Sequence, residues 1–206
     1  MRISFVLGVG AAVTLLGGCS TPDRPTPTDT QPWESVRAAG PPVSSVDAAP
    51  VGVLAVAILA PASGSEVRGF VNFVRDEKAD RIRVEAEVTG LSPGKHGFHI
   101  HEKGDCTAPD ASSAGGHFNP TQMPHAGPEQ SSRHVGDFGN LEADASGAAH
   151  YSRTFDLKVQ GYTSILGKAV IIHENSDDLA TQPSGNAGGR VACGVIESRV
   201  KEGVGR

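Results

Sequence analysis

Hydrophobic and polar residues alternate with a period of two along much of the chain beyond residue 50. Residues 80–90 show this most clearly, because Ile82, Val84, Ala86 and Val88 fall on one face and charged side chains fall between them. Such alternation is typical of a half-buried β-strand. Further strand-like runs occur at 51–61, 66–76, 95–101, 147–156, 168–174 and 190–198.

Turn-forming segments such as "LSPGK" (91–95) and "ASGAA" (145–149) separate several of these runs, and no long run has a helical period. Short strands at regular intervals with turns between them predict an antiparallel β-sandwich or β-barrel. Two stretches, 102–140 and 175–189, do not look like strands. Long irregular loops in a compact domain are uncommon unless they are functional, so we expect functional residues in both.

The N-terminal quarter of the chain has a different composition. Residues 1–18 contain one basic residue and a long apolar run, and Cys19 follows directly. This resembles a bacterial lipoprotein signal cleaved before a lipidated cysteine, and the alternative is an ordinary secretory signal with an incidental cysteine. Residues 19–50 are rich in Pro, Thr, Ser, Asp and Ala, which predicts a disordered tether. We expect the folded domain at 51–200 and a short tail at 201–206.

Charge and cysteine content narrow the function further. The 206-residue chain has a net charge of −5, which argues against a nucleic-acid-binding protein but leaves room for a small anion near local positive charge. With Cys19 assigned to the anchor, Cys106 and Cys193 remain as an even pair in an exported, oxidising compartment. A disulfide is therefore favoured over two free buried thiols.

The histidines form the most informative group of side chains. His99 and His101 lie two apart in a predicted strand and should project from the same face. Four more lie in the predicted loops or at a strand end, and a carboxylate, Asp137, is close to them; these four are His117, His125, His134 and His173. This concentration indicates a metal site.

Five segments carry these residues: "HGFHIHEKGDC", "AGGHFNP", "RHVGDFGNL", "IIHENSDDL" and "GNAGGRVACGVI". In this order they resemble the successive motifs of the copper/zinc superoxide dismutases, over about residues 51–198. The resemblance implies an all-β fold, an eight-stranded antiparallel Greek-key barrel with a long metal-binding loop and a second active-site loop. It also implies dismutation of superoxide to dioxygen and hydrogen peroxide. Cys106, five residues after His101, and the short 175–189 segment are more similar to the bacterial branch.

The same resemblance implies one copper and one zinc ion per chain. The residues that match copper ligands are His99, His101, His117 and His173. The residues that match zinc ligands are His117, His125, His134 and Asp137. His117 thus matches a ligand shared by both metals, which must use both ring nitrogens and can later carry a proton. Four imidazoles suit a copper ion that cycles between two oxidation states, whereas three imidazoles and a carboxylate suit zinc.

Supporting residues also match the family pattern. Asp177 matches an aspartate that accepts hydrogen bonds from His99 and His125 and so fixes their tautomers. Arg190 matches the active-site arginine, whose permanent positive charge would attract superoxide. The expected disulfide between Cys106 and Cys193 matches one in the family.

Some residues and alternatives stay open. His96 and His150 are assigned to neither metal, and the 175–189 segment contains no lysine or glutamate that could guide superoxide, which leaves Lys103 and Arg133 as candidates. The alternative functions are a non-catalytic metal-binding protein of the same fold, a copper-only relative and a zinc hydrolase. The intact ligand sets and arginine argue against them.

Location follows from the N-terminal segment. We expect an enzyme that protects the bacterial cell envelope from superoxide, exported and held at a membrane through Cys19, facing the periplasm or the cell surface. Whether the chain is a monomer or a homodimer cannot be read from the sequence.

Overall fold

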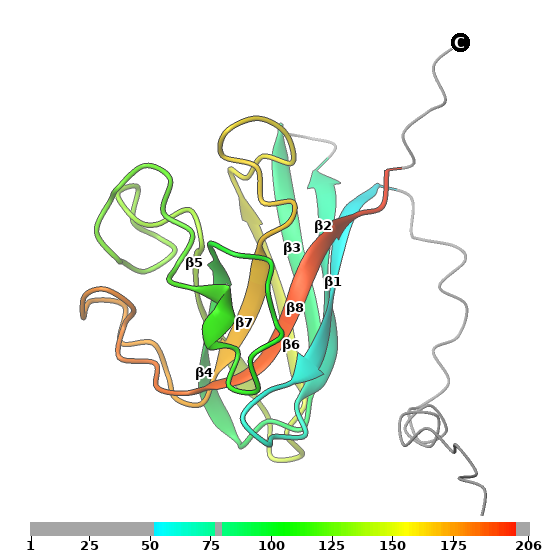
Figure 1. The fold of residues 1–206 in the computed structure, drawn as a ribbon, viewed down its shortest axis with the longest axis vertical. Coiled ribbons are helices and arrows are strands. Elements are labelled where there is room, and N and C mark those ends of the chain that lie inside the picture. Colours follow the sequence, from blue (N-terminus) through cyan, green and yellow to red (C-terminus); the bar gives the residue numbers. More distant parts are fainter. Residues whose placement is uncertain (1–51, 77–79, 201–206) are drawn as a thin grey trace, which may run out of the picture. The chain divides into compact units, whose positions relative to one another are not determined.

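The structure, a computed structural model, describes residues 52–76 and 80–200, and these form a closed antiparallel barrel of eight strands (Figure 1). The strands follow one another around the barrel in the order β1-β2-β3-β6-β5-β4-β7-β8. Their bounds are β1 (Val53–Pro61), β2 (Arg68–Asp76), β3 (Arg81–Thr89), β4 (Gly94–His101), β5 (Asp137–Ala143), β6 (Ala149–Phe155), β7 (Ala169–His173) and β8 (Arg190–Ser198). A 3₁₀ turn, η2 (Ser112–Ala114), lies between β4 and β5. The predicted all-β, eight-stranded fold is confirmed.

The barrel interior explains the alternating sequence pattern. On β3, the even-numbered residues from Ile82 to Val88 are buried and those between them are partly or fully exposed. Strand β2 alternates less strictly, with Val71 and Phe73 fully buried and the neighbouring Val74 buried as well. Phenylalanines fill much of the remaining interior, and the fully buried ones include Phe98 and Phe138, whose ring centroids are 5.2 Å apart.

The prediction that residues 102–140 contain no strand is wrong at their C-terminal end, where β5 begins at Asp137. The segment "DFGNLEA" has no strand-like pattern, because it contains two acids, an asparagine and a glycine. In the structure that glycine, Gly139, has a φ of +80°, which is unusual for a strand. β5 pairs with β4, and the register shifts between Gly97 and His99. This pairing places Asp137 opposite His99, so the strand itself brings two predicted ligands together.

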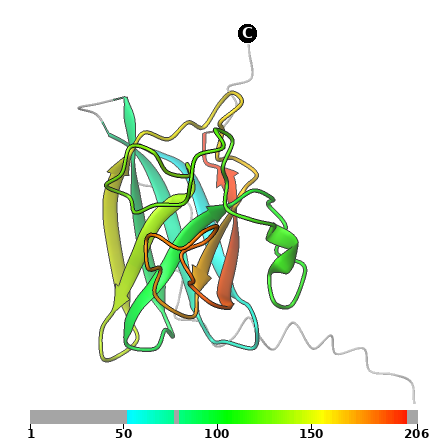
Figure 2. The ribbon, with the colours of Figure 1, turned by 90° about the vertical axis from the view of Figure 1, so that its left-hand side faces the viewer.

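Two long connections extend from the same side of the barrel, at the left of Figure 1, and the part of the first that holds η2 lies nearer the middle of that view and at the right of Figure 2. One joins β4 to β5, and the other joins β7 to β8. The second loop is fastened to β4, because the Gly97 N–H donates to Asn175 O at 2.8 Å. Inside that loop, the Asn175 N–H donates to Ala187 O at 2.9 Å. Both loops therefore cover the face from which His99 and His101 project.

The predicted signal segment 1–18, Cys19, the tether 19–50 and the tail 201–206 lie outside the described residues. Within the described ranges, the structure has no helix whose length and hydropathy would allow it to span a membrane.

Candidate metal centre

Two groups of four buried side chains meet at His117. In each group the potential ligand atoms all lie within 4.8 Å of one another. The first group contains imidazoles from β4, from the β4–β5 loop and from the end of β7: His99, His101, His117 and His173. The second group comes from the same loop and the first residue of β5: His117, His125, His134 and Asp137. The structure thus brings together all seven residues that match metal ligands.

In the first group, each imidazole has one ring nitrogen held by the protein and one left free. His101 Nδ1–H donates to Gly115 O at 2.9 Å, and His173 Nδ1–H donates to Gly188 O at 3.1 Å. His99 uses the other nitrogen, because its Nε2–H donates to Asp177 Oδ2 at 2.8 Å. In this group the buried nitrogens without a hydrogen-bond partner are His99 Nδ1, His101 Nε2, His117 Nε2 and His173 Nε2.

Buried polar atoms almost always have a partner, so four unpartnered nitrogens in one place indicate a site that binds a cation. In each of these rings the other nitrogen is held by a hydrogen bond, and that bond fixes the orientation of the imidazole. A set of four such nitrogens fits a copper ion.

The second group converges on a single carboxylate oxygen. Asp137 Oδ1 lies 2.9 Å from His117 Nδ1, 3.0 Å from His125 Nδ1 and 3.2 Å from His134 Nδ1. The contact with His125 Nδ1 is not aligned as a hydrogen bond. A tetrahedral zinc site with bonds of about 2.0–2.1 Å separates its ligand atoms by about 3.3 Å. The observed separations therefore fit a zinc ion at the centre of these four atoms.

Asp177 links the two groups. Its Oδ2 accepts from His99 as described, and its Oδ1 accepts from His125 Nε2–H at 2.9 Å and from the Leu179 N–H at 2.7 Å. Gly185, whose φ is +68°, makes this arrangement possible, because a Cβ there would lie 1.8 Å from Asp177 Oδ1 and 2.7 Å from His125 Nε2. Asp177 thus orients one imidazole of each group.

Burial and hydrogen bonding set the protonation of these groups before any metal binds. Burial lowers the pKa of His99 to about 4 and that of His173 to about 3, which keeps both rings neutral and able to bind a cation. Burial also opposes the charged form of His125, but contacts with Asp137 and Asp177 outweigh it and raise its pKa to about 9. For those two carboxylates, burial is outweighed by imidazole donors, so their pKa values lie well below the ordinary range.

Arg190 is half-buried at the start of β8 and holds the β4–β5 loop. Its Nη1–H donates to Ala111 O at 2.6 Å and its Nη2–H donates to Gly115 O at 2.7 Å. Gly115 O also accepts from His101, so the guanidinium and an imidazole of the first group share one carbonyl acceptor. Arg190 therefore presents a fixed positive charge beside that group.

The predicted disulfide between Cys106 and Cys193 is confirmed, and it closes a loop of 87 residues in sequence. Cys193 packs with Ala111, Ala114 and Ile171 in a small apolar cluster that the Cys106 side chain also contacts. The bridge ties the loop that carries Ala111 to β8, the strand that carries Arg190. Neither cysteine lies among the potential metal ligands.

Four other side chains that the sequence brought forward lie outside both ligand groups. His96 donates from Nδ1 to His173 O at 2.8 Å and so supports the first group from behind, whereas His150 is exposed on β6. Arg133 donates to His134 O at 2.7 Å and stacks over the Phe155 ring, so its guanidinium is engaged in holding the loop. Lys103 lines a hollow of about 330 Å³ whose wall includes His117.

Sequence reasoning missed two amide side chains. Asn140 and Gln182 each bind both backbone polar groups of one residue of the site, Asp177 and His125 respectively. Asparagine and glutamine have no strong pattern of their own in a sequence, so only the structure could find them.

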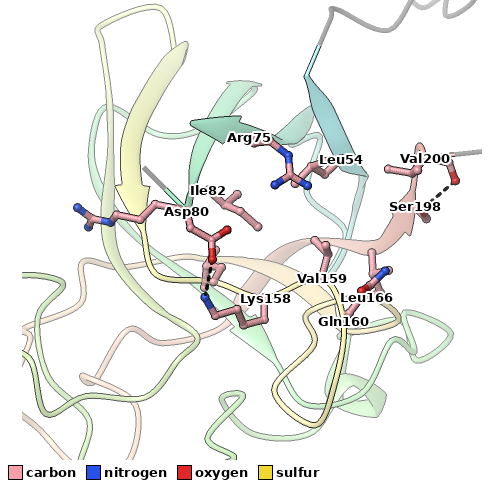
Figure 3. Close-up of a pocket in the computed structure, with 12 residues that line it drawn as sticks. Leu54, Arg75, Asp80, Ile82, Lys158, Val159, Gln160, Leu166, Ser198 and Val200 are labelled. Atoms are coloured by element: carbon pink, nitrogen blue, oxygen red, sulfur yellow. Dashed lines mark hydrogen bonds and ion pairs between the residues drawn. The ribbon is translucent and has the colours of Figure 1, made fainter. Parts of the chain in front are cut away.

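A cavity of about 710 Å³ lies away from both groups (Figure 3). It opens where β1 begins and β8 ends, and Figure 3 shows Leu54, Ile82 and Val159 around it, with Arg75 and the Asp80–Lys158 ion pair at its edge. None of the predicted site residues lines this cavity. The chemistry belongs to the smaller, more crowded histidine region.

Comparisons with known proteins agree with this geometry. A model of the family described as copper/zinc superoxide dismutase (SODC) matches residues 67–196. An extracellular superoxide dismutase [Cu-Zn] of Drosophila melanogaster is 43% identical over 139 residues, which cover 64% of this chain and 76% of that protein. A superoxide dismutase [Cu-Zn] of Onchocerca volvulus is 41% identical over 152 residues, covering 69% and 94%. The crystal structure of the clock protein EA4 matches with a TM-score of 0.64 and 37% identity, over 73% of this chain and 97% of that one.

Proposed function

Because this chain belongs to the copper/zinc superoxide dismutase family, we propose that it dismutates superoxide to dioxygen and hydrogen peroxide at the two histidine groups. The observation that carries the proposal is the shared position of His117. Its Nδ1 lies in the carboxylate-containing group, and its Nε2 is an unpartnered buried nitrogen of the four-histidine group.

The two groups suit different metals. The imidazoles of His99, His101, His117 and His173 would hold copper, and the set of His117, His125, His134 and Asp137 would hold zinc. Copper supplies a centre that accepts and returns one electron, while zinc supplies a positive charge with no redox chemistry. The chain fixes both sets through hydrogen bonds to Gly115 O, Gly188 O and Asp177.

His117 is the residue that we propose moves a proton. A neutral imidazole has one N–H, so binding metals at both nitrogens requires the ring to lose that proton. When Nε2 is not engaged by a metal it can hold a proton, and this atom lies in the buried four-histidine group. That proton would be one of the two that doubly reduced dioxygen takes up to become hydrogen peroxide, and the second would come from water.

Arg190 is proposed to attract and orient the substrate. Superoxide is an anion and the chain is net negative, so a permanently charged guanidinium next to the copper set is required to favour its approach. Both hydrogen bonds of Arg190 go to carbonyl oxygens and none to a carboxylate. These two hydrogen bonds fix the guanidinium in position, and its charge interacts with the carboxylate of Asp110.

The activity test compares two histidine variants with the parent chain. Direct measurement of superoxide decay should give a rate constant near the parent value for His150→Ala, because this side chain is exposed on β6. His101→Ala removes one imidazole of the copper set and should lower the rate at least about 100-fold. A parent chain loaded with both metals that leaves the spontaneous decay unchanged refutes the function.

The finer placement in the cell is also a proposal. A bacterial, lipid-anchored form is supported by the apolar N-terminal run before Cys19 and by the five-residue spacing from His101 to Cys106. We propose an exported protein of the cell envelope with a signal at 1–18, an anchor and tether at 19–50 and the enzyme domain at 51–200. A mature N-terminus other than a lipid-modified Cys19 in a mass spectrum refutes the anchor. Sedimentation of the mature domain distinguishes a homodimer from a monomer.

A further inference from the structure

The loop between β7 and β8 holds the zinc half of the site through a side-chain amide. Gln182 Oε1 accepts from the His125 N–H at 2.8 Å, and Gln182 Nε2 donates to His125 O, also at 2.8 Å. The carboxamide therefore satisfies both backbone polar groups of His125. His125 itself is only 2% exposed, and buried backbone groups need partners.

The same residue is held by its ring. His125 Nε2–H donates to Asp177 Oδ1 at 2.9 Å, and Asp177 belongs to the same β7–β8 loop as Gln182. One short segment, 177–182, therefore forms hydrogen bonds with both the backbone and the ring of His125. With both ends fixed, Nδ1 of His125 is directed at the other ligand atoms of the zinc set.

The segment that carries Asp177 and Gln182 is itself held in shape by hydrogen bonds. Asp178 accepts from the Ala180 N–H at 3.0 Å and from the Thr181 N–H at 2.8 Å, which folds the chain back toward His125. A second amide anchors the segment to the barrel: on β5, Asn140 Oδ1 accepts from the Asp177 N–H at 2.7 Å and its Nδ2 donates to Asp177 O at 2.9 Å.

The composition of the β7–β8 loop favours a role in positioning metal ligands over a role in attracting superoxide. Residues 175–189 contain no lysine and no glutamate, so this loop has few charges with which to guide an anion. What it offers instead is hydrogen bonds to the zinc set.

We propose that Gln182 is a positioning residue for the zinc ligand His125, and that the 177–182 segment fastens zinc in the protein. This inference rests on the proposed function, because it takes His125 to be a zinc ligand. Loss of the amide frees the backbone of His125, so the ligand can swing out of the set and zinc leaves faster. Partners that orient metal ligands typically change metal affinity by about 10–100-fold.

The test follows zinc release from the full chain loaded with copper and zinc. Release is timed with a chelating dye in the parent, Gln182→Ala, Gln182→Met and Gln182→Glu. The alanine and methionine variants should release zinc about 10-fold faster or more. The glutamate variant keeps an acceptor for the His125 N–H but loses the donor to His125 O, so its rate should lie between. Gln130→Ala, at an exposed residue of the β4–β5 loop, is the matched control and should release zinc at the parent rate.

A second readout separates positioning from general weakening of the fold. Cobalt(II) placed in the zinc set has visible absorption bands that depend on ligand geometry, and these should change in the alanine and methionine variants but not in the Gln130→Ala control. Parent-like release and parent-like cobalt spectra in those two variants overturn the role of Gln182 while leaving the proposed function intact. A parent chain that binds no stoichiometric zinc, or a His125→Ala variant that retains it fully, overturns both proposals.

Discussion

Replacing Asp177 by asparagine tests how the two metal sets are coupled. Its carboxylate accepts hydrogen bonds from the Nε2–H groups of both His99 and His125. An asparagine has one acceptor oxygen and one NH₂ donor in the same space. One of the two imidazoles must then face a donor, and it can avoid the clash only by moving its proton to Nδ1. In both rings Nδ1 is the atom that would bind a metal, since it faces the other potential ligand atoms of its set, so one set must lose a competent ligand.

The expected loss of metal affinity follows from the hydrogen bond that the substitution removes. Hydrogen bonds to a charged group contribute about 1.5–3 kcal/mol, and each 1.4 kcal/mol corresponds to a tenfold change in an equilibrium constant. We therefore expect Asp177→Asn to lower the affinity of copper or zinc by about 10–100-fold, in line with other residues that orient metal ligands.

The assay is competition of each metal with a chelator of known affinity, read separately for copper and zinc. Asp144→Asn is the control, because Asp144 is an exposed aspartate that accepts hydrogen bonds only within its own turn. Parent affinities for both metals in Asp177→Asn would show that the shared carboxylate does not orient the two imidazoles.

Three further predictions follow from the same geometry. Arg190→Ala should lower the rate of superoxide decay at least about tenfold with copper retained and should weaken its dependence on ionic strength; an unchanged rate removes Arg190 from the mechanism. Replacing Cys106 and Cys193 by alanine opens a loop of 87 residues and should lower the free energy of unfolding by roughly 4–5 kcal/mol in urea, whereas equal stability would show that the bridge adds nothing. The metal-free protein should lose stability as the pH falls from 6.5 toward 4, because His99 and His173 have pKa values of about 4 and 3 when folded and 6.5 when unfolded. The unfolded chain then binds more protons than the folded one, so the free energy of unfolding falls by up to about 1.4 kcal/mol per pH unit for each histidine. Urea midpoints that stay constant across this range would contradict the prediction.

The strands were predictable where burial on one face imposes a regular pattern. The residues between Ile82 and Val88 alternate because one face fills the barrel and the other meets solvent. Strand β5 breaks this rule, since it begins with the buried acid Asp137 and contains Gly139 in a left-handed conformation. Its place depends on pairing with β4, which is a property of the whole barrel rather than of the local sequence.

The metal site divides in the same way. Histidines two apart on a strand, such as His99 and His101, can be recognised in the sequence as potential metal ligands, because histidine is uncommon and its imidazole binds metals strongly. The amides of Asn140 and Gln182 act through backbone groups that lie 37 and 57 residues away in the chain. Such contacts follow from how two loops meet, so no local pattern could reveal them.

The central claim is that two metals share the imidazole of His117, and electron paramagnetic resonance tests it most directly. The chain is loaded with copper(II) in the four-histidine set and cobalt(II) in the set that contains Asp137. A bridging imidazolate couples the two unpaired-electron systems, so the account predicts that the copper signal is lost when cobalt binds and returns when cobalt is replaced by zinc. A copper signal of full intensity in the presence of stoichiometric cobalt would contradict the account.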